Sequence, residues 1–528
     1  MKKRILIVNC YFDEFRLPIR RRNKIPQSMT PAYLAGLFSP RFCDVKLYNE
    51  QYSGPLEGEG LLDWPHMLVL TGLNTAFDRM LHLTAHAKTR NKGVIVVAGG
   101  PAIRALYHYA RPFFDYCCTG DAEQLQEVIE DAFGAAYVSE QYLRDGWAVP
   151  RYDLTYWIDN PGYVESSRNC YNQCNFCSLT AEDRPYQAYD IEYLRQQFLA
   201  LGKRKVVIFL DNNFGSAGKQ FIRDRFDLLR EMRERGYFWR WCALVSSDFL
   251  HDEENLRLSR ETGCLSLFSG IESFDHDSLV SFRKYQNIRR SQADTIRRCL
   301  EEHITFYYGM VFNIASREIS DLRREIDFMV ESPDITLPSY ISLAIPLPGT
   351  PFFHEYLNQK RILPSIKIRD LDSTTITLRP LDPMPEAVRF VRELQGLIGF
   401  RRKVLHHSGR FLFRYRKHLS FWNMVLALHN ALLLCTPTLA TARPDFGRIS
   451  IKGLRRQPRT FVGTTEPLDP SYSPAFRIDS KYRRYFLPTM LTDCEGNLTD
   501  ALQRDLGTSA GCGEMPPACD ALHRAKAG

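Results

Sequence analysis

Three cysteines lie within eight residues of one another in the first third of the chain. Cys170, Cys174 and Cys177 have the spacing C-x3-C-x2-C, and Phe176 immediately precedes the last of them. Thiolates are the usual ligands of a 4Fe-4S cluster, which offers four iron corners. Three thiolates on one short loop can hold three corners and leave the fourth iron open to a chelating substrate or cofactor. The spacing therefore predicts an iron–sulfur site in this loop.

Three other interpretations of these cysteines are weaker. A closed zinc site uses four ligands with a second pair downstream, whereas the next cysteines, Cys242 and Cys264, are solitary. Disulfide pairing leaves one of three thiols over, and the flanking sequence is typical of an intracellular protein. Three buried thiols without any ligand are the plain structural alternative, but few short motifs are this specific.

The cysteine loop resembles the cluster loop of the radical S-adenosylmethionine (radical SAM) enzymes. In that family the open iron chelates the amino and carboxylate groups of the methionine moiety, and an electron from the cluster cleaves the sulfonium to a 5′-deoxyadenosyl radical. The resemblance implies that Cys170, Cys174 and Cys177 are the cluster ligands. It also implies that Phe176 packs beside the adenine.

Length and charge limit the classes of protein that this chain can represent. Its 528 residues are too many for a single hydrophobic core of ordinary size, so two or three domains are expected. Much of the net charge of +8 arises after residue 400. No aromatic and basic nucleic-acid pattern accompanies this charge, so we expect no nucleic-acid partner. The first residues have the pattern of a strand, and their apolar run is too short for the core of a signal peptide. Fourteen cysteines without a secretory signal indicate a reducing compartment, so we expect a cytoplasmic protein.

Strands and helices alternate over residues 1–140. Short apolar runs at 4–8, 67–71, 93–98 and 113–116 are separated by helical stretches such as 31–38 and 76–88. This alternation predicts an α/β domain with a doubly wound, Rossmann-like parallel sheet. Ligands of such sheets lie at the carboxyl ends of the strands, and glycine there permits close approach to a bulky ligand. The candidate residues in these loops are Gly72, Asn74, Gly99, Gly100, Gly120 and Glu123.

In order and spacing these loops are similar to the cobalamin-binding domain that precedes the radical core in one large radical SAM branch. The Gly-Gly-Pro turn and the Gly-Asp/Glu-x-Glu turn recur there, so the resemblance implies cobalamin binding by these six residues. Many such domains carry Asp-x-His-x-x-Gly after the first strand. Here residues 9–15 read Asn-Cys-Tyr-Phe-Asp-Glu-Phe, without histidine. We expect cobalamin without a histidine ligand; the alternative is a domain that binds nothing.

A linker at 141–160 leads to a second α/β region at 161–360. Apolar runs of strand length recur there and predict about six strand–helix units, which form a partial, open (β/α)6 barrel. Residues 346–351, Pro-Leu-Pro-Gly-Thr-Pro, resemble the closing segment of the same radical SAM branch. The predicted strands are 163–167, 205–210, 239–244, 264–273, 304–312 and 339–345.

Polar residues end two of these strands. Asp211 and Asn213 follow the second strand, and Ser246 follows the third. Side chains at the carboxyl ends of barrel strands usually face the active site, where such groups suit ribose hydroxyls or the methionine amine. A turn is the structural alternative for Asp211 and Asn213.

The next strand ends in Gly270-Ile271-Glu272-Ser273. It resembles the radical SAM Gly-x-Glu-Ser element, which implies that Gly270 and Glu272 help to hold the polar end of S-adenosylmethionine. A buried glutamate needs a cationic partner, and the methionine ammonium supplies one. For Arg283 and Lys284, just downstream, we favour solvated charge over contact with the cofactor carboxylate.

The last third of the chain contains fewer signals. We expect a mainly helical substrate-capping region at 361–506, with an amphipathic helix at 386–403, and a disordered tail at 507–528. Residues 401–435 combine basic and apolar segments. A buried helix with a basic flank is the favoured explanation, and peripheral contact with an anionic membrane is the alternative. We do not expect Cys512 and Cys519 to hold a second cluster.

Together these features predict a cobalamin-dependent radical C-methyltransferase. It would act on an unactivated carbon of a small natural-product or lipid-like substrate and use two S-adenosylmethionine molecules per turnover. An external donor such as flavodoxin or ferredoxin would supply electrons. Two alternatives stay open. One is a cyclase or rearrangement enzyme without methyl transfer, and the other is a non-catalytic, cluster-bearing binding or electron-transfer protein.

Overall fold

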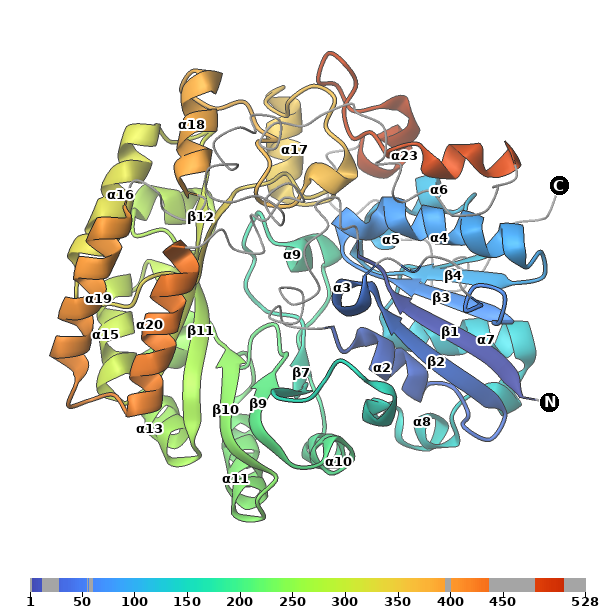
Figure 1. The fold of residues 1–528 in the computed structure, drawn as a ribbon, viewed down its shortest axis with the longest axis horizontal. Coiled ribbons are helices and arrows are strands. Elements are labelled where there is room, and N and C mark those ends of the chain that lie inside the picture. Colours follow the sequence, from blue (N-terminus) through green and yellow to red (C-terminus); the bar gives the residue numbers. More distant parts are fainter. Residues whose placement is uncertain are drawn as a thin grey trace. The chain divides into compact units, whose positions relative to one another are not determined.

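The computed structural model describes residues 2–11, 28–54, 56, 60–394, 400–435 and 480–507. The chain divides into two compact units. The described residues up to 158, together with 354–377 and 480–507, form the first unit; residues 159–353 and the described part of 378–435 form the second. Figure 1 shows both units. The predicted tail and its two cysteines, at 508–528, lie outside the described residues.

The first unit is built on a five-stranded sheet in which every pairing is parallel, in the order β2-β1-β3-β4-β5. The predicted doubly wound sheet is thereby confirmed. An additional edge strand, β2, escaped the sequence pattern because its solvent-facing residues are polar. The pairing of Val97 with Tyr116 places the start of β5 three residues after the predicted one. The strands are β1 (Lys3–Asn9), β2 (Cys43–Asn49), β3 (Met67–Thr71), β4 (Ile95–Gly99) and β5 (Tyr116–Cys118).

Helices cover both faces of this sheet. Figure 1 shows α2 (Thr30–Gly36) and α7 (Leu125–Phe133) on one face and α4 (Phe77–Arg90) on the other. Residues from late in the chain complete the unit over α4, where the Thr489 N–H donates to Asp78 Oδ1 at 3.0 Å. The remaining helices are α3 (Glu50–Ser53), α5 (Pro101–Ala105), α6 (Tyr107–Ala110), α8 (Glu140–Asp145) and α23 (Gln503–Leu506).

The second unit is an open half-barrel of six parallel strands, in the order β13-β12-β11-β10-β9-β6. Neighbours in the sheet are also successive barrel strands in the chain, because each strand–helix unit packs beside the preceding one. The predicted partial barrel is confirmed, and its core is aromatic, with fully buried Trp241 against Phe209 and Phe214. The strands are β6 (Gly162–Val164), β9 (Arg204–Phe209), β10 (Phe238–Leu244), β11 (Cys264–Glu272), β12 (Thr305–Phe312) and β13 (Tyr340–Leu343).

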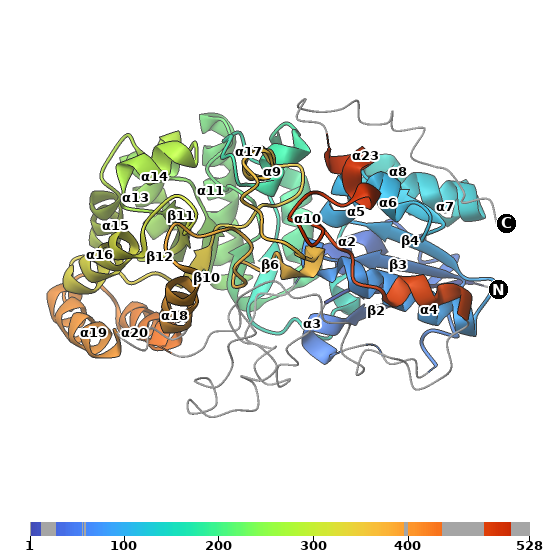
Figure 2. The same ribbon diagram turned by 90° about the horizontal axis from the view of Figure 1, so that it is seen from above.

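Helices α13 (Glu253–Glu261), α15 (Gln292–Glu301) and α16 (Ile319–Glu331) lie along one face of this sheet (Figures 1 and 2). A short hairpin, β7 (Ser167–Arg168) with β8 (Gln187–Ala188), frames the cysteine loop. The other helices of this unit are α9 (Ser178–Glu182), α10 (Ile191–Leu201), α11 (Lys219–Glu234), α12 (Ser247–His251), α14 (His276–Ser281), α18 (Met384–Leu394), α19 (Arg401–Tyr415) and α20 (Phe421–Cys435). Helix α17 (Pro351–Asn358) begins in this unit and continues into the first at His354.

In the described part of the chain, no helix combines the length and the apolar character needed to cross a membrane.

Candidate iron–sulfur and cofactor site

The cysteine loop connects β7 to α9 in the second unit. Cys174 is buried, and Cys170 and Cys177 are half-buried. Asn175 anchors the loop: its side-chain amide donates to the Ser281 carbonyl at 2.8 Å, and its carbonyl accepts from the Phe352 N–H at 3.0 Å. The loop is thus held to distant parts of the half-barrel.

Amide groups surround two of the three thiols. Cys170 Sγ lies 3.6 Å from Asn213 Nδ2, and Cys174 Sγ lies 3.6 Å from Gln286 Nε2. Such donors stabilise thiolates and orient metal ligands. Burial raises the pKa of Cys177 to about 11, so cluster binding would have to release this proton.

Three thiols on one loop with amide donors beside them fit an iron–sulfur cluster. In the described part of the chain, no three His, Cys, Asp or Glu side chains converge closely enough to hold a single metal ion. The fit therefore rests on the chemistry of the donors. The sequence reasoning missed Gln286, which lies in a short 3-10 helix, Tyr285–Asn287, that has no clear sequence signal.

Asn213 and Ser246 come together beside Cys170. The Asn213 amide donates to Ser246 Oγ at 3.0 Å, and Asn213 Oδ1 accepts from the Ser246 N–H at 3.1 Å. These bonds join the segments that follow β9 and β10. The structure thus brings together three of the residues that the sequence nominated.

Asp211 is fully buried and holds the chain just before the cysteine loop. Its carboxylate accepts from the Ser166 N–H at 2.8 Å and from the hydroxyls of Ser166 and Ser167 at 2.5 and 2.6 Å. Arg225 of α11, also fully buried, lies 3.6 Å from the same carboxylate and donates to Ser166 Oγ at 3.0 Å. These contacts occupy the carboxylate, so we propose that Asp211 positions the loop and does not bind S-adenosylmethionine.

Sequence reasoning missed the partners of Asp211. Arg225 is one of many charged residues in an amphipathic helix, and its inward orientation has no sequence signal. Burial lowers its pKa to about 10, which still leaves the guanidinium charged at neutral pH.

Glu272 forms a buried ion pair with Lys284, whose Nζ lies 2.5 Å from Glu272 Oε1. The expectation of a solvated Lys284 is wrong, because only 8% of this residue is exposed. Arg283, with φ of +52°, reverses the chain after α14 and stays exposed itself, while Lys284 turns inward. Burial opposes the charge on Lys284, but the carboxylate of Glu272 and the thiol of Cys174 raise its pKa.

Gly270 makes room for this pair. A Cβ at position 270 would lie 2.1 Å from Glu272 Oε1 and 2.7 Å from Lys284 Nζ. Phe176 packs edge-on against Phe282, with 5.0 Å between ring centroids, and Lys284 Nζ lies 5.9 Å from the Phe176 ring. Glu272, Lys284 and Phe176 therefore lie beside the cysteine loop.

In the first unit, the nominated glycines lie where strands β3, β4 and β5 end. Gly100 has φ of +112°, and a Cβ there would lie 2.8 Å from the Gly72 carbonyl oxygen. A Cβ on Gly72 would lie 2.8 Å from the Cys10 carbonyl oxygen. These two glycines therefore allow neighbouring loops to pack against one another, whereas a Cβ on Gly99 would make only ordinary contacts.

The other three nominated residues border the same edge of the sheet. Gly120 N–H donates to Gln124 Oε1 at 2.6 Å, and Glu123 accepts from the Tyr33 hydroxyl. Asn74 Oδ1 is buried and has no hydrogen-bond partner among the described residues. The buried Asn74 oxygen lacks a donor, and the neighbouring loops contain glycines, which leave room for a bulky ligand. Cobalamin fits this arrangement, because its amide side chains donate hydrogen bonds. The loop after β1 is described only to Tyr11, and residues 12–15 of the motif comparison lie outside the described part.

Comparison with known proteins agrees with this geometry. Residues 164–314 match the Radical SAM superfamily. An uncharacterized methyltransferase of Synechocystis is 25% identical over 67% of this chain and 67% of its own length. The bacteriochlorophyllide d C-12(1)-methyltransferase of Chlorobaculum tepidum is 27% identical over 38% of this chain, which corresponds to 43% of that enzyme.

The fold is also found in a solved structure. The cobalamin-dependent S-adenosylmethionine radical enzyme OxsB superimposes with a TM-score of 0.57 at 14% identity, over 82% of this chain and 72% of that one. At this identity the likeness concerns the fold, with its N-terminal parallel sheet, its half-barrel and its helical C-terminal part. The chain is thus an enzyme that carries a Radical SAM domain at residues 164–314, and its fold is that of the solved OxsB structure.

Proposed function

We propose that the protein is a cobalamin-dependent radical C-methyltransferase acting on an unactivated carbon of a natural-product or lipid-like substrate. Two features together carry the proposal. The half-barrel contains a loop with three cysteines, and the doubly wound sheet has Gly72, Asn74 and Gly100 in the loops that follow the carboxyl ends of its strands. Methyltransferases among the similar proteins support the reaction class.

When bound, the cluster supplies the electron that cleaves S-adenosylmethionine, and cobalamin carries the methyl group. Cys170, Cys174 and Cys177 would hold the cluster, with Asn213 and Gln286 donating hydrogen bonds to two of the sulfurs. These five side chains would hold the cluster in one position.

Glu272 and Lys284 suit the charged end of the methionine moiety. A zwitterion carries one ammonium and one carboxylate, and this buried pair offers one partner for each. The two residues neutralise one another in the absence of the zwitterion, which lowers the cost of burying both charges. Phe176, beside the same pair, would provide the apolar surface for the adenine.

Anaerobic reconstitution tests the proposal. With dithionite and S-adenosylmethionine, wild-type protein should form 5′-deoxyadenosine. Cys174→Ala should lose the iron–sulfur absorbance and this product, because three ligands are needed to hold the cluster. Cys242→Ala is the matched control and should leave both unchanged, since the Cys242 thiol lies outside the cysteine loop and accepts from the Ser266 hydroxyl in β11 at 3.1 Å. An unaltered product yield in Cys174→Ala would contradict the assignment.

Product analysis distinguishes methyl transfer from rearrangement. Methyl transfer adds one CH2 to the substrate and releases S-adenosylhomocysteine, whereas a cyclase or rearrangement enzyme releases none.

Because the reductive cleavage consumes one electron, we propose an external donor such as a flavodoxin or ferredoxin. All described cysteines are free thiols, which supports a reducing compartment.

A further inference from the structure

Helix α20 buries two amide side chains and exposes several apolar ones, unlike an ordinary surface helix. The side that faces the half-barrel carries two buried asparagines. Asn423 Nδ2 donates to Thr305 Oγ1 at 2.9 Å and to the Leu265 carbonyl at 3.2 Å, and Asn430 Nδ2 donates to the Leu337 carbonyl at 2.8 Å. Amide hydrogen bonds thus help to hold this side of the helix inward, together with the buried Ala431 and Leu434.

The outward side of α20 is apolar. Phe421, Val425, Leu428 and Leu432 follow one another at helical spacing and are 68, 38, 38 and 49% exposed. Trp422, beside this stripe, is 59% exposed. The prediction that this segment is a buried helix is therefore wrong for one face. Contiguous exposed apolar side chains on a folded protein mark an interaction site.

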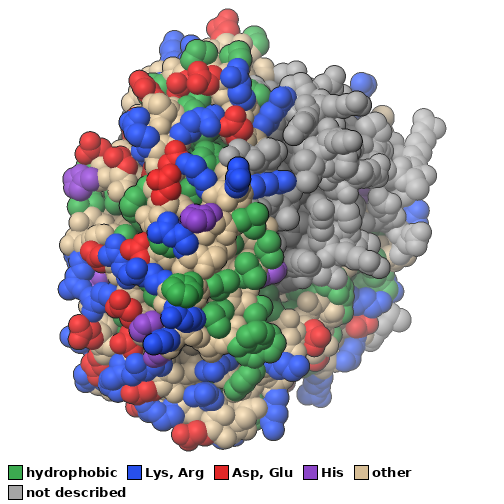
Figure 3. All heavy atoms as spheres, turned by 60° about the vertical axis from the view of Figure 1, so that its left-hand side comes forward, with side chains coloured by type: hydrophobic (Ala, Val, Ile, Leu, Met, Phe, Trp, Pro, Cys, Tyr) green, Lys and Arg blue, Asp and Glu red, His purple; other side chains and the backbone are tan. Residues whose placement is uncertain are grey.

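Helix α19 extends this surface and adds positive charge. Leu405 and Phe413 are 63 and 69% exposed. Arg402 and Arg410 of α19 are exposed, as is Lys417 two residues after its end, and no described carboxylate forms an ion pair with them. Residues 400–435 contain seven Lys and Arg and no Asp or Glu. Figure 3 shows apolar and basic side chains side by side on this face.

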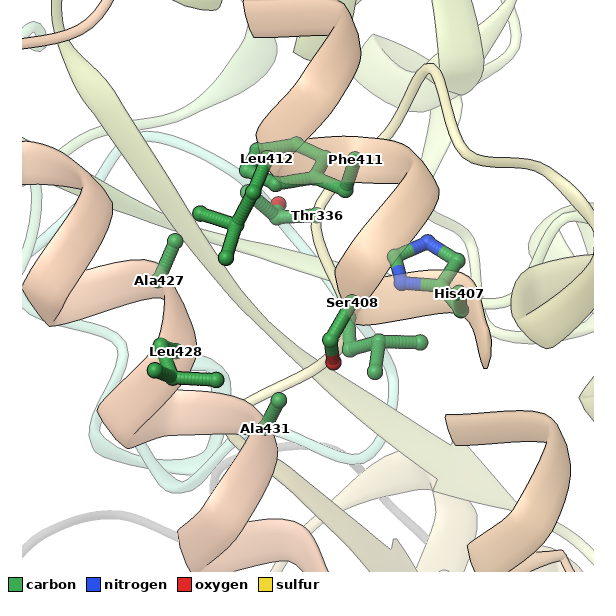
Figure 4. A pocket seen from close by; sticks show the side chains of 9 residues that line it. Thr336, His407, Ser408, Phe411, Leu412, Ala427, Leu428 and Ala431 are labelled. Atoms are coloured by element: carbon green, nitrogen blue, oxygen red, sulfur yellow. The ribbon is translucent and has the colours of Figure 1, made fainter. Parts of the chain in front are cut away.

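The contact between the two helices leaves no room for a ligand. Figure 4 shows the depression between them, which is lined by Phe411 and Leu412 of α19 and by Ala427, Leu428 and Ala431 of α20. Its volume is about 10 Å3, no more than the space of a single water molecule. The His407 Nε2–H donates to the carbonyls of Ser332 and Ile335 at 3.0 and 3.1 Å and fixes α19 to the half-barrel. The exposed apolar residues therefore form an outer surface and not the wall of a binding pocket.

We propose that this α19–α20 surface docks on an anionic phospholipid bilayer. Aromatic and aliphatic side chains on one face with Arg and Lys along it are the features of helices that lie in a membrane interface. Phe421 and Trp422 would enter the headgroup region, and the arginines and Lys417 would contact lipid phosphates. A protein partner or a second copy of the chain would have to place acidic groups opposite Arg402, Arg410 and Lys417. An anionic bilayer presents phosphate groups over its entire surface and needs no such matching. The proposal does not depend on the enzymatic function.

Flotation with liposomes tests the proposal on the full chain. Wild-type protein should float with phosphatidylglycerol–phosphatidylcholine vesicles and not with pure phosphatidylcholine. Binding should weaken in high salt. The pair Arg410→Glu and Lys417→Glu should reduce the bound fraction by at least about tenfold, because each reversed charge loses attraction to the anionic surface. Phe421→Ser with Trp422→Ser should do the same without changing the helix content.

The matched control is Trp239→Ser, since Trp239 is 56% exposed on β10 of the same unit. This variant should bind vesicles as the wild type does. The proposal would be overturned if all variants floated equally, or if binding did not depend on lipid charge. It would also be overturned if sedimentation showed a dimer that dissociates in the Phe421→Ser, Trp422→Ser protein, because the surface would then join two copies of the chain.

Discussion

At the scale of single residues, the Asp211–Arg225 pair is the feature whose removal should be most costly. Both side chains are fully buried, and the carboxylate holds Ser166 and Ser167 directly upstream of Cys170. Asp211→Asn would leave the guanidinium without its counter-charge, which costs about 3–5 kcal/mol in comparable buried pairs. We expect a loss of this size in urea unfolding and lower iron content after reconstitution. The exposed pair of Glu192 and Arg195 is the control, where Glu192→Gln should cost about 1 kcal/mol or less. Equal losses in the two variants would contradict the role of Asp211.

At the scale of elements, the register of α20 depends on two amides. Asn423→Ala should leave the Leu265 carbonyl and Thr305 Oγ1 with one donor fewer, at a cost of about 1–3 kcal/mol. We expect faster hydrogen exchange of the backbone amides of α20 and little change in the barrel strands. His429→Ala is the matched control on the exposed side of the same helix and should change stability by less than about 0.5 kcal/mol. Unaltered exchange in Asn423→Ala would show that apolar packing alone holds the helix.

At the scale of the whole molecule, each unit has its own sheet and core. A substitution that destabilises the cobalamin loops of the first unit should therefore leave the iron–sulfur cluster of the second unit in place. Gly100→Val places a Cβ at 2.8 Å from the Gly72 carbonyl oxygen, at a position where φ is +112°. We expect corrinoid absorbance to fall several-fold while iron stays near about four per chain. Gly134→Val has a similar φ of +100° but no atom within 4 Å of the added Cβ, so it controls for backbone strain alone. Loss of iron together with the corrinoid would show that the units depend on one another.

The sequence alone determined the two α/β sheets and the cysteine loop. Strand-length apolar runs and a short-range ligand spacing are local properties, and each can be recognised without knowing what packs against it. Asn213 and Ser246 were nominated by their places at strand ends, and Gly270 and Glu272 by the resemblance of residues 270–273 to the radical SAM Gly-x-Glu-Ser element.

Only the tertiary structure decided how the charged and amide side chains are used. Asp211 meets Arg225, Glu272 meets Lys284, and Cys174 meets Gln286 through contacts between residues from 12 to 112 positions apart. The outward orientation of the apolar stripe on α20 is equally non-local, because Asn423 finds its partners more than a hundred residues upstream. A charged or amide side chain has the same sequence signature whether it is solvated or paired. Its partner, and hence its role, exists only once the chain has folded.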